Sequence, residues 1–333
     1  MIIVLGKNIT EQEKINILER IKENGLTPHI SEGIEKTLIG VVGDERILQA
    51  KPLDGMPGIE KIIQILKPFK LVSRDFKNEN TVIEINGNKF GNGDFDFIAG
   101  PCSVESKEQI FLTAKFLSQK GIKYLRGGAF KPRTSPYSFQ GLGIEGLEYM
   151  REAARLYDMS VISEVVDARD IELCYKFVEV FQVGARNMQN FNLLRELGNQ
   201  SKPVLLKRGM SSTIKEWLMA AEYIMLKGNS NIILCERGIR TFEDYTRNTL
   251  DLSAVIAAKK ETHLPVIVDP SHGTGRKDMI LKMTLAAKVI GADGVMVEVH
   301  PEPEKALSDS AQSMNFKEFD NLITEVKKLK WPQ

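Results

Sequence analysis

The chain has 333 residues, of which 42% are hydrophobic and 27% are charged, as is usual for a soluble globular protein with a sizeable core. The 45 Lys and Arg residues almost balance the 44 Asp and Glu residues, which argues against nucleic acid or an anionic membrane as a partner. No apolar run approaches the ~20 residues that span a bilayer, and the first residues lack the basic start of a signal peptide. The three cysteines form no CxxC pair, which favours free thiols in a reducing cytoplasm.

The first 74 residues alternate short apolar runs with one clear helix signal. Thr10 and Glu13 have the spacing of a capping box, which predicts that a helix begins there. The expected elements are a strand Met1–Leu5, a helix Thr10–Glu23, strands Thr27–Ile34 and Lys36–Val42, a helix Ile59–Leu66 and a strand Phe69–Ser73. This order predicts a ferredoxin-like α+β domain over residues 1–74.

Residues 75–93 are expected to form a linker and a hairpin. The β-branched run from Thr81 to Ile85 favours a strand, and Asn86-Gly87 is a strong signal for a hairpin turn. Such a hairpin would suit the bottom of the domain that follows, as a plug.

From residue 94 to residue 333 the chain repeats a strand followed by a helix-like stretch. The strands are short and almost continuously apolar, as expected when both faces of a parallel sheet are covered. Eight strands are predicted, at residues 95–99, 123–126, 160–163, 180–183, 203–206, 231–234, 265–268 and 294–297. This repetition predicts a (β/α)8 TIM barrel. A doubly wound open sheet is the alternative, but it normally uses fewer strands.

Basic residues follow several of these strands. In a (β/α)8 barrel the active site lies at the carboxyl ends of the strands, so these side chains would converge there. They are Arg126, Lys131, Arg133, Arg186, Lys207, Arg208 and Arg237. Converging cations repel one another unless an anion binds, and Arg and Lys suit phosphate and carboxylate. The pattern therefore indicates an anionic ligand with more than one such group. The alternative is that several of these residues lie in surface salt bridges, which are often inert.

A second set of strand-end residues has the chemistry of metal ligands. Cys102, His272, Glu298 and Asp309 follow the first, seventh and eighth strands. One thiolate, one imidazole and two carboxylates suit borderline divalent ions. Because these residues are scattered along the chain, their spacing alone leaves other interpretations open. Cys102 fits a small buried residue, and His272 fits a helix cap or a core histidine.

Several motifs at successive strand ends together resemble a known family. They are Ala99-Gly100-Pro101-Cys102-Ser103, the segment from Arg126 to Ser135, Asp269-Pro270-Ser271-His272, and His300-Pro301-Glu302-Pro303 with Ser308-Asp309. The chain from about residue 95 to 312 resembles 3-deoxy-arabino-heptulosonate 7-phosphate (DAHP) synthase, in the branch related to KDO 8-phosphate synthase. The leading ferredoxin-like domain resembles a regulatory extension that some members carry.

The resemblance implies a reaction and roles for the matching residues. The reaction is the condensation of phosphoenolpyruvate with erythrose 4-phosphate and water, which gives DAHP and phosphate at the start of the shikimate pathway. The implied ligands of a divalent metal such as Mn, Fe, Co or Zn are Cys102, His272, Glu298 and Asp309. The implied contacts of phosphoenolpyruvate are Arg126, Lys131, Arg186, Lys207 and Arg237, with Ala185 also at the substrate. The aldose would lie on Lys131-Pro132-Arg133-Thr134, with Arg133 and Thr134 on its distal phosphate. Lys131, Cys102 and His272 would act in catalysis, and Glu164 and Asp269 would either support other residues of the site or position water.

Two other functions stay open. One is KDO 8-phosphate synthase, which uses arabinose 5-phosphate; that family typically reads Lys-Ala-Asn-Arg where this chain has Lys131-Pro132-Arg133-Thr134. The other is a barrel without catalytic activity that senses a phosphorylated metabolite. The resemblance further implies feedback inhibition by Tyr or Phe through the leading domain. A homo-oligomer, a tetramer by our expectation, would suit such control.

Overall fold

The computed structural model describes residues 1–33, 36–43, 53, 55–63, 67–131, 135 and 137–330. The chain divides into two compact units, one of residues 1–79 with 261–263 and one of the remaining residues. Among the helices of the described residues, none is long and apolar enough to cross a membrane.

The first unit contains a four-stranded antiparallel sheet and a helix. Its sheet has the order β2-β3-β1-β4, and the side chains of α1 help to bury its core. The capping box forms as predicted, because the Thr10 amide donates to the Glu13 carboxylate at 2.8 Å and the Glu13 amide donates to Thr10 Oγ1 at 3.3 Å. The elements are β1 (Ile2–Leu5), α1 (Glu11–Glu23), β2 (Thr27–Glu32), β3 (Thr37–Val42) and β4 (Ile59–Ile63).

Two predicted elements of this unit are wrong. Ile59–Ile63, predicted as the start of a helix, is the strand β4, which pairs antiparallel with β1. Its isoleucines at 59, 62 and 63 have the spacing of one helix face, but β-branched side chains favour a strand, and the strand pairs with β1 through a shift in register. Residues 69–73 form only an isolated bridge, from Ser73 to Thr262, so their apolar character reflects burial. Ile34 and residues 64–66 of the predicted elements lie outside the described residues.

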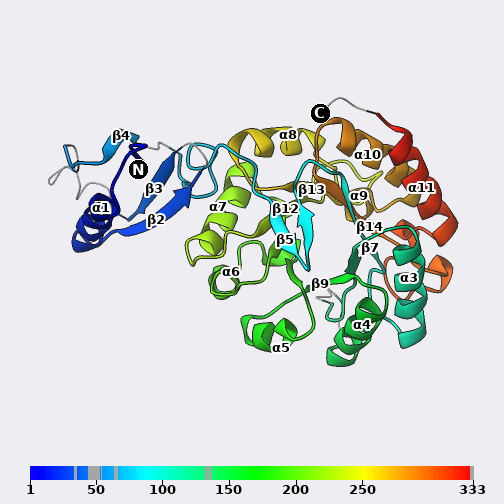
Figure 1. The fold of residues 1–333 in the computed structure, drawn as a ribbon. Helices are drawn as coiled ribbons and strands as arrows, with labels where there is room; N and C mark the ends of the chain where they lie inside the picture. Colours follow the sequence, from blue (N-terminus) through cyan, green and yellow to red (C-terminus); the bar gives the residue numbers. More distant parts are fainter. Residues whose placement is uncertain are drawn as a thin grey trace. The chain divides into compact units, whose positions relative to one another are not determined.

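The second unit is a closed barrel of eight parallel strands with helices around the outside (Figure 1). All eight predicted strands are confirmed within two residues, and pairing of the last strand with the first excludes the open sheet. The strands are β7 (Asp96–Gly100), β8 (Tyr124–Arg126), β9 (Ser160–Glu164), β10 (Val180–Val183), β11 (Val204–Lys207), β12 (Ile232–Glu236), β13 (Val266–Val268) and β14 (Gly294–Glu298). The helices are α3 (Lys107–Gln119), α4 (Ile144–Leu156), α5 (Ile171–Tyr175), α6 (Phe191–Gly198), α7 (Ile214–Met225), α8 (Leu252–Glu261), α9 (Pro270–Thr274), α10 (Lys277–Val289) and α11 (Phe316–Lys328).

A hairpin packs into one end of this barrel. Strands β5 (Ile83–Ile85) and β6 (Asn88–Phe90) join at Asn86-Gly87, where both residues have the positive φ of a type I′ turn. Ile83, Ile85 and Phe90 share one buried cluster with interior side chains of the barrel strands. The Phe90 ring meets Tyr124, the first residue of β8, edge-on at 5.4 Å. The amino-terminal end of the barrel is therefore filled, which leaves the carboxyl end for chemistry.

Candidate active site

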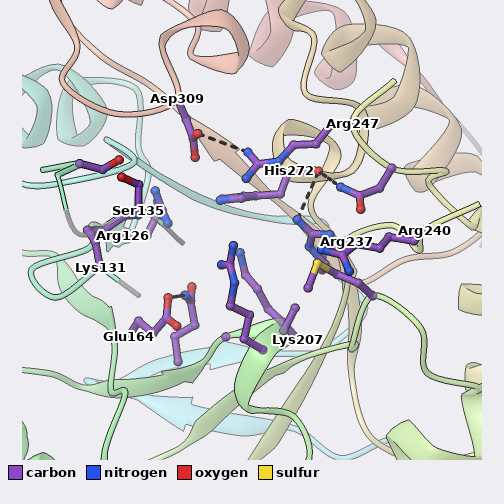
Figure 2. A pocket seen from close by; sticks show the side chains of 17 residues that line it. Arg126, Lys131, Ser135, Glu164, Lys207, Arg237, Arg240, Arg247, His272 and Asp309 are labelled. Atoms are coloured by element: carbon purple, nitrogen blue, oxygen red, sulfur yellow. Dashed lines mark hydrogen bonds and ion pairs between the residues drawn. The ribbon is translucent and has the colours of Figure 1, made fainter. Parts of the chain in front are cut away.

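The carboxyl ends of the strands surround a cavity of about 410 Å³ (Figure 2). This volume is typical of sites for small metabolites. Seven cationic side chains of the described residues line it, namely Arg126, Lys131, Arg186, Lys207, Arg237, Arg240 and Arg247. The cavity is therefore suited to a ligand with several negative charges.

Two of the predicted cations are not among these seven, and two of the seven were not predicted. Arg208 does not line the cavity, because its guanidinium bonds to Glu236 at 2.9 Å and to Asp251 at 3.0 Å. Arg133 lies outside the described residues. Arg240 and Arg247, which the sequence interpretation missed, both come from the segment between β12 and α8. The unusual length of this strand-to-helix connection, with its repeated arginines, is the signal that could have found them.

The four predicted metal ligands come together beside this cavity. One ligand atom from each of Cys102, His272, Glu298 and Asp309 lies within 4.8 Å of the others. Cys102 Sγ is 3.2 Å from Asp309 Oδ2, and His272 Nε2 is 3.3 Å from Glu298 Oε1. Asp309 adopts a left-handed backbone with φ of 51°, which is uncommon outside glycine and is often found at functional sites.

The surroundings of His272 prepare it to bind a metal through Nε2. Burial lowers the pKa of His272 although Asp269 and Glu298 oppose the shift, so the imidazole is neutral near pH 7. Its Nδ1 lies 2.7 Å from Asp269 Oδ2, the arrangement that fixes the tautomer of metal-binding histidines. Burial would raise the pKa of Asp269, but His272 and Lys207 hold it well below its usual range. Asp269 is therefore a charged acceptor for both neighbours.

Each acidic member of this ligand set has a cation beside it. Lys131 Nζ is 3.1 Å from Cys102 Sγ, and Arg126 Nη1 is 3.0 Å from Glu298 Oε1. Arg247 Nη1 is 3.3 Å from Asp309 Oδ1. Burial would raise the pKa of Asp309, but Arg247 and His272 lower it to about 2. Burial raises the pKa of the Cys102 thiol to about 12, so a metal that binds the thiolate would displace a proton.

Glu164 is an acidic residue on the wall of the cavity opposite Asp309 (Figure 2). Gln182 Nε2 donates to its Oε2 at 3.3 Å. Gly184 leaves room for this carboxylate, because a Cβ there would lie only 2.1 Å from Glu164 Oε1. Ala185 and Arg186 follow directly and also line the cavity. The side chain that was predicted to position water thus faces the space where a substrate would lie.

Comparison with known proteins assigns the chain to a family. Residues 77–332 match the model of the DAHP synthetase I family. The chain belongs to this family. Residues 1–67 match the DAHP synthase ferredoxin-like domain, so both parts of the chain have counterparts among DAHP synthases. Membership of the DAHP synthase family assigns the chain the first step of the shikimate pathway.

Individual relatives resemble the chain to different degrees. The chain is 53% identical to the phospho-2-dehydro-3-deoxyheptonate aldolase of Thermotoga maritima over 99% of its own length and 97% of the relative. A crystal structure of the Thermotoga maritima DAHP synthase matches with a TM-score of 0.78 at 52% identity, over 98% of this chain and 96% of that one. A 2-dehydro-3-deoxyphosphooctonate aldolase of Francisella tularensis is 29% identical over 71% of this chain and 93% of its own length.

Proposed function

We propose that the cavity joins phosphoenolpyruvate to erythrose 4-phosphate beside a divalent metal held by Cys102, His272, Glu298 and Asp309. The observation that carries this proposal is the convergence of four ligand atoms within 4.8 Å at the edge of a cationic cavity. A phosphometabolite sensor without activity would need the anion site but not the ligand set.

The ligand set fits a borderline divalent ion such as Mn, Fe, Co or Zn. It offers one sulfur, one imidazole nitrogen and carboxylate oxygen, a mixture that these ions accept. Asp269 supports His272 in the way that a metal-binding histidine requires. When bound, such an ion supplies Lewis-acid polarisation of the aldehyde oxygen of the aldose.

We assign different cations to the two substrates. We assign the phosphate and carboxylate of phosphoenolpyruvate to Arg126, Lys131, Arg186, Lys207 and Arg237. Lys207 is supported by its 2.6 Å bond to Asp269, which holds the ammonium group at the cavity wall. Arg133 and Thr134 stay a prediction for the distal phosphate of the aldose. Ser135 and Ser138, on the same segment, line the cavity and support this placement.

Each step of the proposed reaction has protein side chains that support it. Carbon 3 of phosphoenolpyruvate forms a bond to the aldehyde carbon. We assign the proton given to the aldose oxygen to Lys131, whose Nζ lies 3.1 Å from Cys102 Sγ. Water adds at carbon 2, which has become electron-poor, and Glu164 positions that water. Asp269 is fully buried and does not line the cavity, so it acts only through Lys207 and His272, to which it bonds. The C–O bond to phosphate breaks, and phosphate leaves among the arginines. Fixed cations stabilise these charges without reorganising, which is the main source of rate enhancement in such sites.

The choice of aldose has a direct test. We expect phosphoenolpyruvate to disappear faster with erythrose 4-phosphate than with arabinose 5-phosphate, because the segment at Lys131 to Thr134 favours the shorter sugar. The measurement is the loss of phosphoenolpyruvate absorbance with each aldose at equal concentration. Faster turnover with arabinose 5-phosphate would instead support the KDO 8-phosphate alternative.

We further assign the ferredoxin-like unit to feedback inhibition by Tyr or Phe, in a cytoplasmic homotetramer. The family of residues 1–67 supports this assignment, as does the core that this unit forms by itself. A truncated DAHP synthase of Thermotoga maritima matches 78% of this chain with a TM-score of 0.74, so a barrel of this kind has been obtained in shortened form.

Removing residues 1–74 should preserve condensation and abolish inhibition by the aromatic amino acid. The barrel has its own buried cluster and contains the proposed ligand set, so the catalytic groups stay in place. The measurement is the initial rate of the full chain and the shortened chain with and without Tyr or Phe. Inhibition that survives the deletion would place the effector on the barrel.

A further inference from the structure

A buried amide joins the two carboxylates of the proposed metal site. Gln312 is only 2% exposed, and its Nε2 lies 2.7 Å from Glu298 Oε2 and 3.5 Å from Asp309 Oδ2. Its Oε1 accepts a bond from Arg247 Nη1 at 3.0 Å. The carboxylates need a donor and the guanidinium needs an acceptor, so these partners determine the orientation of the amide.

Arg247 and Gln312 together hold one oxygen of each carboxylate. Arg247 lies against Asp309 Oδ1, the ion pair drawn as a dashed line in Figure 2, while Oδ2 lies 3.2 Å from Cys102 Sγ and 3.5 Å from Gln312 Nε2. Gln312 holds Glu298 Oε2, while Oε1 lies 3.3 Å from His272 Nε2 and also accepts a bond from Arg126 Nη1 at 3.0 Å. Each carboxylate is therefore restrained with its second oxygen turned toward the other ligands.

The chain anchors both side chains close to the ligands. Gln312 ends the 3-10 turn that begins after Asp309, and its amide donates to the Asp309 carbonyl at 3.3 Å. The Arg247 amide donates to the Thr274 carbonyl at 2.9 Å, at the end of α9, the helix that carries His272. Gly275 allows this approach, because a Cβ there would lie 2.6 Å from Arg247 Cβ. Arg247 is thereby tied to the histidine helix and to Asp309 at once.

We propose that Gln312 and Arg247 are positioning residues of the metal site, which hold Glu298 and Asp309 as ligands through one oxygen each and so set the metal affinity. This inference rests on the proposed metal site and adds the residues that hold its carboxylate ligands in place. Hydrogen bonds to metal ligands typically change metal affinity by about 10–100-fold. Without Gln312 the two carboxylates would lose their shared donor and could rotate away from this arrangement.

The test is a Co²⁺ titration of the full chain after removal of metal by a chelator. Bound Co²⁺ is followed through its thiolate charge-transfer absorption and its d–d bands. We expect Gln312→Leu to raise the Kd for Co²⁺ by about 10–100-fold and to alter the d–d bands. Asn229→Leu is the matched control, because it removes a buried amide that bonds to main-chain groups of Leu197, Lys202 and Asn231. This control should keep the wild-type Kd.

The outcomes separate the inference from the proposed function. A Gln312→Leu protein with the wild-type Kd and spectrum would overturn the role of Gln312. A wild-type protein that shows no thiolate band would overturn the metal site itself. Should Gln312→Leu fail to fold, Arg247→Met decides, because this side chain is 40% exposed and its loss leaves the core intact. The inference then requires weaker Co²⁺ binding by Arg247→Met, and an unchanged Kd contradicts it.

Discussion

Replacing Cys102 with Ala should lower the rate of condensation by more than about 100-fold and prevent stoichiometric metal binding. Loss of a group that merely supports a ligand costs up to about 100-fold, so loss of a ligand itself should cost more. Cys102 is the only sulfur among the four grouped ligands of the described residues. The measurements are the steady-state rate with both substrates and the bound metal per chain after dialysis.

Cys174→Ala provides the matched control for this experiment. Cys174 is also buried, but it lies on α5 and takes no part in the ligand group. We expect it to keep metal binding and turnover, with at most a small loss of stability from the missing sulfur atom. Near wild-type turnover by Cys102→Ala would show that the thiol is no ligand in the active enzyme.

Arg208→Met should destabilise the barrel by about 3–5 kcal/mol, the usual cost of removing one partner from a buried ion pair. Glu236 is 0% exposed and would keep its charge without the 2.9 Å bond to Arg208. Urea denaturation would measure the loss in the free energy of unfolding. Burial already raises the pKa of Glu236, and the loss of Arg208 would raise it further. The folded variant would then bind a proton more readily than the unfolded chain, so the penalty should shrink as the pH falls.

Arg237→Met is the informative comparison, because Arg237 lines the cavity whereas the neighbouring Arg208 is held in an ion pair outside it. Arg237 lines the cavity, and its guanidinium bonds within the described residues go to the carbonyls of Gly238 and His272 at 3.4 and 3.5 Å. Burial lowers its pKa, so holding this charge costs stability. We expect a higher KM for phosphoenolpyruvate with little loss in the free energy of unfolding. A large loss of stability with unchanged KM would reverse the roles given to Arg208 and Arg237.

The sequence predicts the barrel better than it predicts the small unit. Strands buried on both faces are short apolar runs, and their eightfold repetition leaves few other folds. In the small unit the run Ile59–Ile63 has the spacing of a helix face, yet it forms a strand that pairs with β1 through a register shift. That pairing is a tertiary contact, which a local pattern does not contain.

The site was predictable where residue chemistry follows the strand ends. The four residues of the proposed metal site and five cations of the cavity could be named because a parallel barrel gathers such residues at one end. Arg208 could not be separated from them, because its partners Glu236 and Asp251 are brought to it only by folding. Gln312 is a single amide in a polar segment, and only its contacts distinguish it from any other glutamine.

The closure of the barrel between β7 and β14 gives the ligand group a further property. Cys102 follows the first strand and Asp309 follows the last, so 207 residues separate two atoms that lie 3.2 Å apart. During synthesis the thiol would leave the ribosome long before its carboxylate partners, and a half-made chain would lack the complete binding group. A cation that needs all four ligands would therefore bind only the closed barrel and would stabilise it by mass action.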